Sequence, residues 1–133
     1  MQTLTWDNRY QLGIPTVDAQ HQKLFAVYNS LVTALRQNQS DAAVLEALRE
    51  MVRYTGTHFC DEERFMLESF YPSFMAHRRQ HSYFIQKTQV FLNEYEAEKN
   101  GLSETVCGFL KNWLVRHILE ADREFAAYHS THG

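Results

Sequence analysis

Two histidines stand among aromatic residues in the segment Phe74-Met75-Ala76-His77-Arg78-Arg79-Gln80-His81-Ser82-Tyr83-Phe84. His77 and His81 are four residues apart, and a helix with about 3.6 residues per turn places both imidazoles on one face. Buried imidazole nitrogens need a polar partner, because burial without one is costly, and a metal ion is one such partner. The same face carries Phe74, Phe84, Thr88, Phe91 and Tyr95, so we expect it to point inward.

Apolar residues repeat at intervals of three and four along the rest of the chain, which is typical of amphipathic helices. Turn-forming residues separate four such segments, and no segment shows the alternation typical of a strand. Long helices joined by short turns favour antiparallel neighbours. The sequence therefore predicts an all-α protein, an antiparallel up-down-up-down four-helix bundle in a single domain. We expect an irregular N-terminal arm at 1–17 and helices at about 18–37, 41–67, 72–99 and 103–127.

Short polar stretches indicate where these helices begin and end. Asp18 or Thr16 can cap the first helix, and Asn38-Gln39-Ser40-Asp41 is typical of a turn followed by an N-cap. Pro72 suits the first turn of the third helix, where its missing N–H is not needed. We expect the third helix to end at Asn100-Gly101. Ser103 is the expected N-cap of the fourth helix.

Length and composition narrow the classes of protein. The chain has 133 residues, 44% of them hydrophobic, which is enough for one domain with a sizeable core. Its formal net charge is −3 and its basic residues are dispersed, so we expect no nucleic-acid partner. We also expect no membrane insertion and a cytoplasmic location, because no long apolar run or signal-peptide pattern is present. Cys60 and Cys107 are interpreted as free thiols.

Histidines and carboxylates form one set that draws on all four predicted helices. Antiparallel packing brings the start of the first helix to the end of the second, and the start of the third to the end of the fourth. All the members therefore fall near one end of the bundle, at a level where two metal ions fit better than one. The members are His21 from the first helix, His58 and Glu62 from the second, His77 and His81 from the third, and His117 and Asp122 from the fourth.

The number of donors agrees with two ions of unequal coordination. If both carboxylates and one solvent oxygen bridge the ions, three histidines complete six-coordination on one ion. Two histidines leave the other ion five-coordinate, with the vacant position that a ligand needs. Each member also has a plain structural interpretation. Taken singly, His21 could be a solvated first-turn residue, His58 with Glu62 a surface pair, His117 a core histidine, and Asp122 a solvated residue.

The spacing of His117 and Asp122 does not suit a regular helix. Five residues correspond to about 140° around an ideal helix, so the two side chains would point to different faces. They can share a site only if the helix is locally widened or ends there. We therefore predict a π-type distortion between Leu119 and Arg123, since such bulges are frequent at functional sites.

The combined pattern of His, His-x3-Glu, His-x3-His and His-x4-Asp resembles that of the hemerythrin family, specifically the single-domain bacteriohemerythrins. The resemblance covers nearly the whole chain, from Trp6 and Gly13-Ile14 in the arm to the segment Trp113-Leu114-Val115-Arg116-His117-Ile118-Leu119-Glu120-Ala121-Asp122. It implies two iron ions, Fe2+ or Fe3+, joined by an oxo or hydroxo group. By this resemblance, His77, His81 and His117 hold one iron, His21 and His58 hold the other, and Glu62 and Asp122 bridge them.

The resemblance also implies that dioxygen binds at the two-histidine iron, beside an apolar pocket. The pocket residues would be Leu24, Phe59, Trp113, Leu114 and Ile118. These residues flank the proposed ligands and are all apolar, as a site that excludes water requires. Ordinary core packing is the other interpretation of each of them.

Reversible dioxygen binding for transport, storage or delivery is the function that the sequence favours, and no catalytic residue is assigned. An oxygen or redox sensor acting on a separate partner is one alternative. A di-iron enzyme that handles peroxide or nitric oxide is another, although the chain lacks the Glu-x-x-His pairs of carboxylate-rich oxidases. Zinc could also occupy such nitrogen and oxygen donors. We expect a monomer, and the sequence does not identify a protein recipient.

Overall fold

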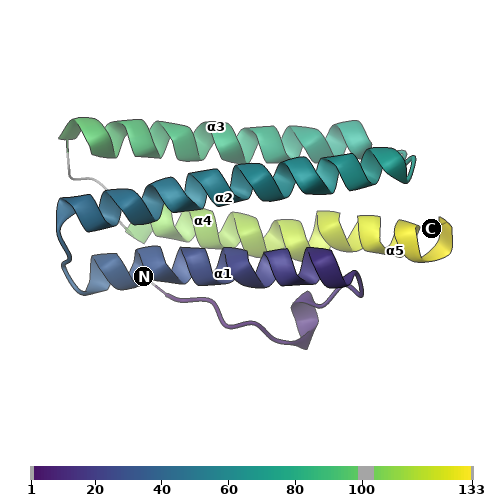
Figure 1. Cartoon of the computed structure of the whole chain (residues 1–133), viewed down its shortest axis with the longest axis horizontal. Helices are drawn as coiled ribbons and strands as arrows, with labels where there is room; N and C mark the ends of the chain where they lie inside the picture. Colours follow the sequence, from purple (N-terminus) through teal and green to yellow (C-terminus); the bar gives the residue numbers. More distant parts are fainter. Residues whose placement is uncertain (1, 99–103, 133) are drawn as a thin grey trace.

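The computed structural model describes residues 2–98 and 104–132, and it shows an antiparallel four-helix bundle (Figure 1). This confirms the all-α architecture predicted from the sequence; the described residues contain no strand. The last three elements follow one another without a break and form the fourth rod. The elements are η1 (Asn8–Tyr10), α1 (Pro15–Arg36), α2 (Asp41–Glu68), α3 (Phe74–Glu98), α4 (Glu104–His117), the π-helical η2 (Ile118–Asp122) and α5 (Arg123–His132).

The N-terminal arm lies along the outside of α1 (Figure 1). The Leu4 N–H donates to Oδ1 of Asn29 over 2.7 Å, and the Asn29 amide donates back to the Leu4 carbonyl over 2.8 Å. The Tyr10 ring packs on Phe25 with centroids 4.9 Å apart, and Trp6 packs on Phe25 at 5.2 Å. These contacts fix the arm to the first rod.

α1 begins at Pro15, three residues before the expected start at 18, and neither Thr16 nor Asp18 is its N-cap. Ile14 occupies the cap position without a side-chain hydrogen bond. Asp18 is instead a buried residue of the first turn, whose carboxylate accepts the N–H groups of Leu12 and Gly13 at 2.9 and 3.1 Å. The carboxylate thus holds the end of the arm against the helix, which periodicity alone did not indicate.

The later helix ends follow their local chemistry. Ser40 caps α2, because its hydroxyl accepts the N–H of Ala43 over 3.2 Å. α3 begins at Phe74, two residues beyond Pro72, which lies in the preceding turn. The Ser73 carbonyl accepts the His77 N–H over 3.1 Å, so the helical hydrogen bonds start after the proline. The ends expected at Asn100-Gly101 and Ser103 lie outside the described residues.

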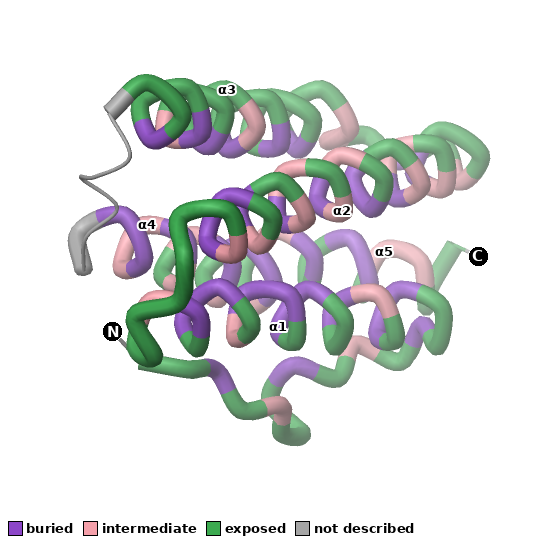
Figure 2. Tube along the Cα trace, turned by 60° about the vertical axis from the view of Figure 1, so that its left-hand side comes forward, coloured by how far each residue is buried: buried purple, intermediate pink, exposed green. Residues whose placement is uncertain are grey.

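The buried faces of the rods point toward the bundle axis (Figure 2). Large apolar side chains such as Leu31, Leu48 and Leu110 are fully buried there. The buried hydroxyls of Thr55 and Thr88 donate to carbonyls of their own helices, so they add no unpaired polar group to the core. No described helix is both long enough and apolar enough to cross a membrane.

Candidate metal centre

Seven side chains from all four rods converge on one buried site toward the α2–α3 end of the bundle. Each of them is at most 5% exposed. The structure thus brings together every residue that the sequence placed in the predicted set. They are His21 of α1, His58 and Glu62 of α2, His77 and His81 of α3, His117 of α4 and Asp122 of η2.

Helical spacing explains how most of these side chains come together. His58 and Glu62 are four residues apart on α2, and His77 and His81 are four apart on α3, so each pair shares one helix face. The fourth rod requires a different device. A π-helical turn spans Ile118–Asp122, where the sequence predicted a widening between Leu119 and Arg123. The wider turn brings Oδ1 of Asp122 to 3.2 Å from Nε2 of His117.

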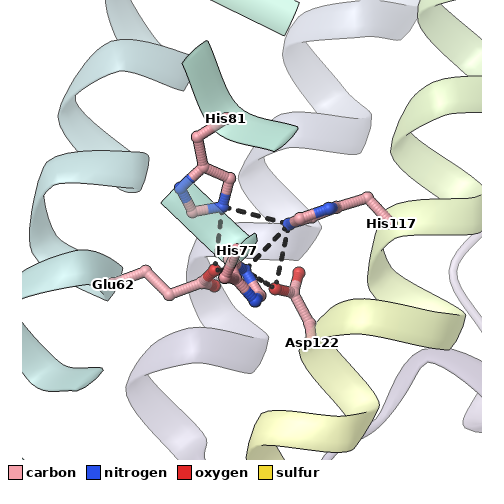
Figure 3. Close-up of side chains that lie close together, drawn as sticks. All are labelled: Glu62, His77, His81, His117 and Asp122. Atoms are coloured by element: carbon pink, nitrogen blue, oxygen red, sulfur yellow. Dashed lines mark hydrogen bonds and ion pairs between the residues drawn. The ribbon is translucent and has the colours of Figure 1, made fainter. Parts of the chain in front are cut away.

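Three histidines form one half of the site (Figure 3). Nε2 of His117 lies 3.0 Å from Nε2 of His77 and 3.0 Å from Nε2 of His81. Two donors bound at right angles to one ion, with bonds of about 2.1 Å, would lie about 3.0 Å apart. Both of these separations are those expected of neighbouring ligands on a single metal ion.

His21 and His58 form the other half. Their Nε2 atoms lie 3.6 and 3.4 Å from Oε2 of Glu62. Oε1 of the same carboxylate lies 2.8 Å from Nε2 of His77, in the first half. Asp122 is placed in the same way, with Oδ2 at 3.1 Å from His21 and Oδ1 at 2.9 Å from His77. Each carboxylate therefore faces both groups of histidines.

The unpaired polar atoms show that these residues fit metal ions. Both ring nitrogens of His21, Oε2 of Glu62 and both carboxylate oxygens of Asp122 are buried and make no well-directed hydrogen bond, although Nε2 of His21 lies 3.1 Å from Oδ2 of Asp122. Leaving such atoms unpaired costs about 1–3 kcal/mol each, and more where they are charged. Imidazole and carboxylate donors suit zinc and iron alike, and bound cations would satisfy the inward-facing atoms of this site.

A family model described as the hemerythrin HHE cation binding domain matches residues 12–128, a range that includes all seven side chains. The chain belongs to the hemerythrin family. It is 34% identical to a bacteriohemerythrin of Stenotrophomonas maltophilia, over 95% of this chain and 81% of that protein. It is 30% identical to a myohemerythrin of Riftia pachyptila, over 90% of this chain and 88% of that protein.

A solved structure of a wild-type hemerythrin has the same fold. It superposes with a TM-score of 0.86 at 24% sequence identity, covering 95% of this chain and 97% of that one. The family and the buried histidine and carboxylate cluster together indicate a non-heme iron site in this hemerythrin-family chain.

Outer hydrogen bonds orient three of the histidines. Nδ1–H of His58 donates to Oε1 of Gln20 over 2.6 Å, and Nδ1–H of His117 donates to Oε1 of Gln80 over 2.8 Å. Nδ1–H of His81 donates to a carboxylate oxygen of Glu63 over 2.8 Å. Each bond places the proton on Nδ1 and leaves the Nε2 lone pair directed at the site.

Sequence reasoning did not single out Gln20, Glu63 or Gln80. Each is the immediate neighbour of a predicted ligand in the chain, and that adjacency was the only available signal. The hydrogen bond of each residue to a histidine joins two different helices, so it depends on how the helices pack.

Electrostatics within the metal-free cluster favour ionised carboxylates. Burial alone would lower the pKa of His21 and His77, but Asp122 and Glu62 outweigh it and raise both pKa values to about 9. Burial opposes ionisation of Glu62, yet hydrogen bonds from the surrounding histidines hold its pKa well below the usual range. Burial lowers the pKa of His117. Without a metal, protons on His21 and His77 therefore balance the two carboxylates.

The five apolar residues predicted beside the site lie in or against the main core. Leu24, Phe59, Leu114 and Ile118 are at most 2% exposed, and Trp113 is half-buried. The Phe59 ring stacks on His81 with centroids 3.9 Å apart, and Trp113 stacks on His117 at 4.4 Å. Cys60 is exposed and Cys107 is buried, and both are free thiols.

Proposed function

We propose that this chain binds dioxygen reversibly at a non-heme di-iron centre, for oxygen transport, storage or delivery. The observation that carries the proposal is the unequal division of five histidines around two shared carboxylates. If both ions had the same number of histidines, both would have a vacant position or both would be fully coordinated. The 3:2 division leaves a single vacancy, which is the requirement for a one-ligand carrier.

Each side chain has a defined role in this proposal. His77, His81 and His117 would hold the first iron and His21 and His58 the second. Hydrogen bonds at Nδ1 keep the rings of His58, His81 and His117 in place. Glu62 and Asp122, which face both groups of histidines, would be shared between the two ions, and an oxo or hydroxo group would complete the centre. When bound, the two irons supply the electrons that dioxygen binding requires. The protein supplies the ligand geometry and the charge balance.

The apolar side chains are proposed to keep the vacant position dry. Leu24, Phe59, Trp113, Leu114 and Ile118 carry no titratable group, so none of them can deliver a proton to a bound ligand. Exclusion of water protects bound Fe2+ from irreversible oxidation, because solvent assists that reaction. The stacked rings of Phe59 and Trp113 also restrict rotation of His81 and His117.

The donor set supports binding over catalysis. Five of the seven donors are imidazoles, whereas the carboxylate-rich di-iron oxidases use Glu-x-x-His pairs. Family membership alone does not separate a carrier from a sensor that signals to another protein, so the decisive property is the reversibility of binding.

Visible spectroscopy tests the proposal. Iron-loaded protein is reduced under argon, exposed to dioxygen and then returned to argon, with spectra recorded at each step. We expect a charge-transfer band that appears with dioxygen and disappears when it is removed, over repeated cycles. A single irreversible oxidation, or oxidation coupled to turnover of an added substrate, would contradict reversible carriage.

A further inference from the structure

A cleft of about 330 Å³ leads from the surface to the metal cluster. Thr16 and Gln20 of α1 contribute to one side, and Asp61, Arg64 and Glu68 of α2 contribute to the other. Its wall includes Glu62, one of the two carboxylates that face both halves of the cluster. Glu62 is only 2% exposed, and its Oε2 has no hydrogen-bond partner. The cleft therefore reaches a buried carboxylate residue that belongs to the metal cluster.

Three carboxylate residues line this cleft, Asp61, Glu62 and Glu68. Glu68 is exposed and forms no ion pair among residues 2–98 and 104–132. Asp61 is less exposed, and one of its carboxylate oxygens lies 3.2 Å from the Arg64 guanidinium. Arg64 is the only basic side chain among the described lining residues, against Asp61, Glu62 and Glu68. The balance of charge favours a cation.

A second groove on the molecule has the opposite character. It holds about 600 Å³ and reaches His117 from the side of α3 and α4. Arg79 and Arg116 line it, and Glu120 is its only described acidic residue. A hydrated divalent cation is repelled by this groove and attracted by the first, so the two routes to the cluster are not equivalent.

We propose that the cleft between α1 and α2 is the entry site for divalent metal ions. Glu68 and Asp61 bind the hydrated cation transiently and pass it to Oε2 of Glu62, because oxygen donors suit such ions. Gln20 links the two stages, since its amide donates to Asp61 over 3.1 Å and its Oε1 accepts from His58 over 2.6 Å. The inference rests on the proposed metal centre, and its test separates the two.

Loading kinetics test this route. Metal-free protein is mixed with Fe2+ under argon, uncaptured iron is quenched with excess ferrozine at set times, and bound iron is counted. At low ionic strength we expect Glu68→Gln and Asp61→Asn each to load about threefold more slowly, and the double variant about tenfold more slowly. The final content should stay at the wild-type value, and added salt should narrow the difference in rate.

Glu120→Gln is the matched control, because it removes the same charge from the rim of the other groove. It should load at the wild-type rate or faster. Glu68 is exposed, so we expect the Glu68→Gln variant to fold as the wild type does, and its loading rate reports on the route rather than on misfolding. Wild-type rates in Glu68→Gln and the double variant, or equal slowing by Glu120→Gln, would overturn the entry route and leave the metal centre standing. A wild-type chain that retains no iron would overturn both.

Discussion

The amide of Gln80 illustrates how a single residue outside the cluster can determine its chemistry. Its Oε1 accepts Nδ1–H of His117 at 2.8 Å, which keeps the opposite nitrogen unprotonated and directed at His77 and His81. His117 is also the proposed metal ligand that directly precedes the π-turn, and this turn brings Asp122 to the same site. Loss of this bond would free the ring to rotate or change tautomer.

Gln80→Leu should therefore weaken metal binding while the fold persists. Outer partners of metal-bound histidines typically contribute 10- to 100-fold in affinity, so we expect a fall of about that size. Titration against a competing chelator measures it. Gln86→Leu, an exposed change on the same helix, is the control and should bind metal as the wild type does. Equal affinity in the two variants would show that the Gln80 bond does not position His117.

At the scale of elements, the π-turn of η2 is the least regular part of the fourth rod. It lies between two regular helices, α4 and α5, and carries Asp122 at its end. A wider turn has poorer hydrogen-bond geometry than an α-helix, so it should open more readily unless something holds both of its ends. Metal ions bound to His117 and Asp122 would hold them.

Hydrogen exchange should report this directly. In metal-free protein we expect the amides of 118–122 to exchange faster than those of 110–114 in the same rod. Metal loading should slow the first group at least tenfold and change the second group much less. Mass spectrometry of peptic fragments, with and without metal, provides the measurement. Unchanged exchange at 118–122 after loading would mean that the turn is not tied to the metals.

The bundle and the convergence of its polar residues could be predicted from the sequence because both depend on local spacing. Pairs at i and i+4 share a helix face wherever the helix lies, as with His77 and His81. The early start of α1 could not be predicted, since Asp18 acts through hydrogen bonds to the arm. Glu63 was likewise hidden, because its partner His81 is on another helix. The role of the seven clustered histidines and carboxylates as metal ligands stays a prediction.

At the scale of the whole molecule, the metal-free protein should lose stability as the pH rises. His21 and His77 have folded pKa values of about 9, above the unfolded value of 6.5. Their stabilisation is therefore complete below about pH 6.5 and is lost as the pH rises through about 9. We expect a loss on the order of 3 kcal/mol for each of the two histidines over this window. Above about pH 9, the buried carboxylates of Glu62 and Asp122 lie close together without a positive charge to balance them.

Thermal unfolding across this pH range, with and without metal, tests that expectation. Metal ions replace the two protons, so the loaded protein should hold its melting temperature between pH 6.5 and 9. The metal-free protein should melt at progressively lower temperatures over the same interval. If the metal-free protein instead gained stability with rising pH, the protons could not be the counter-charge of Glu62 and Asp122.

We propose that two metal ions occupy one buried site with unequal numbers of histidines. Anomalous diffraction at the iron absorption edge, from crystals of iron-loaded protein, tests it most directly. We expect two peaks about 3.5 Å apart, one bound by His77, His81 and His117 and the other by His21 and His58, with Glu62 and Asp122 between them. A single peak, or a pair with equal histidine coordination, would contradict it.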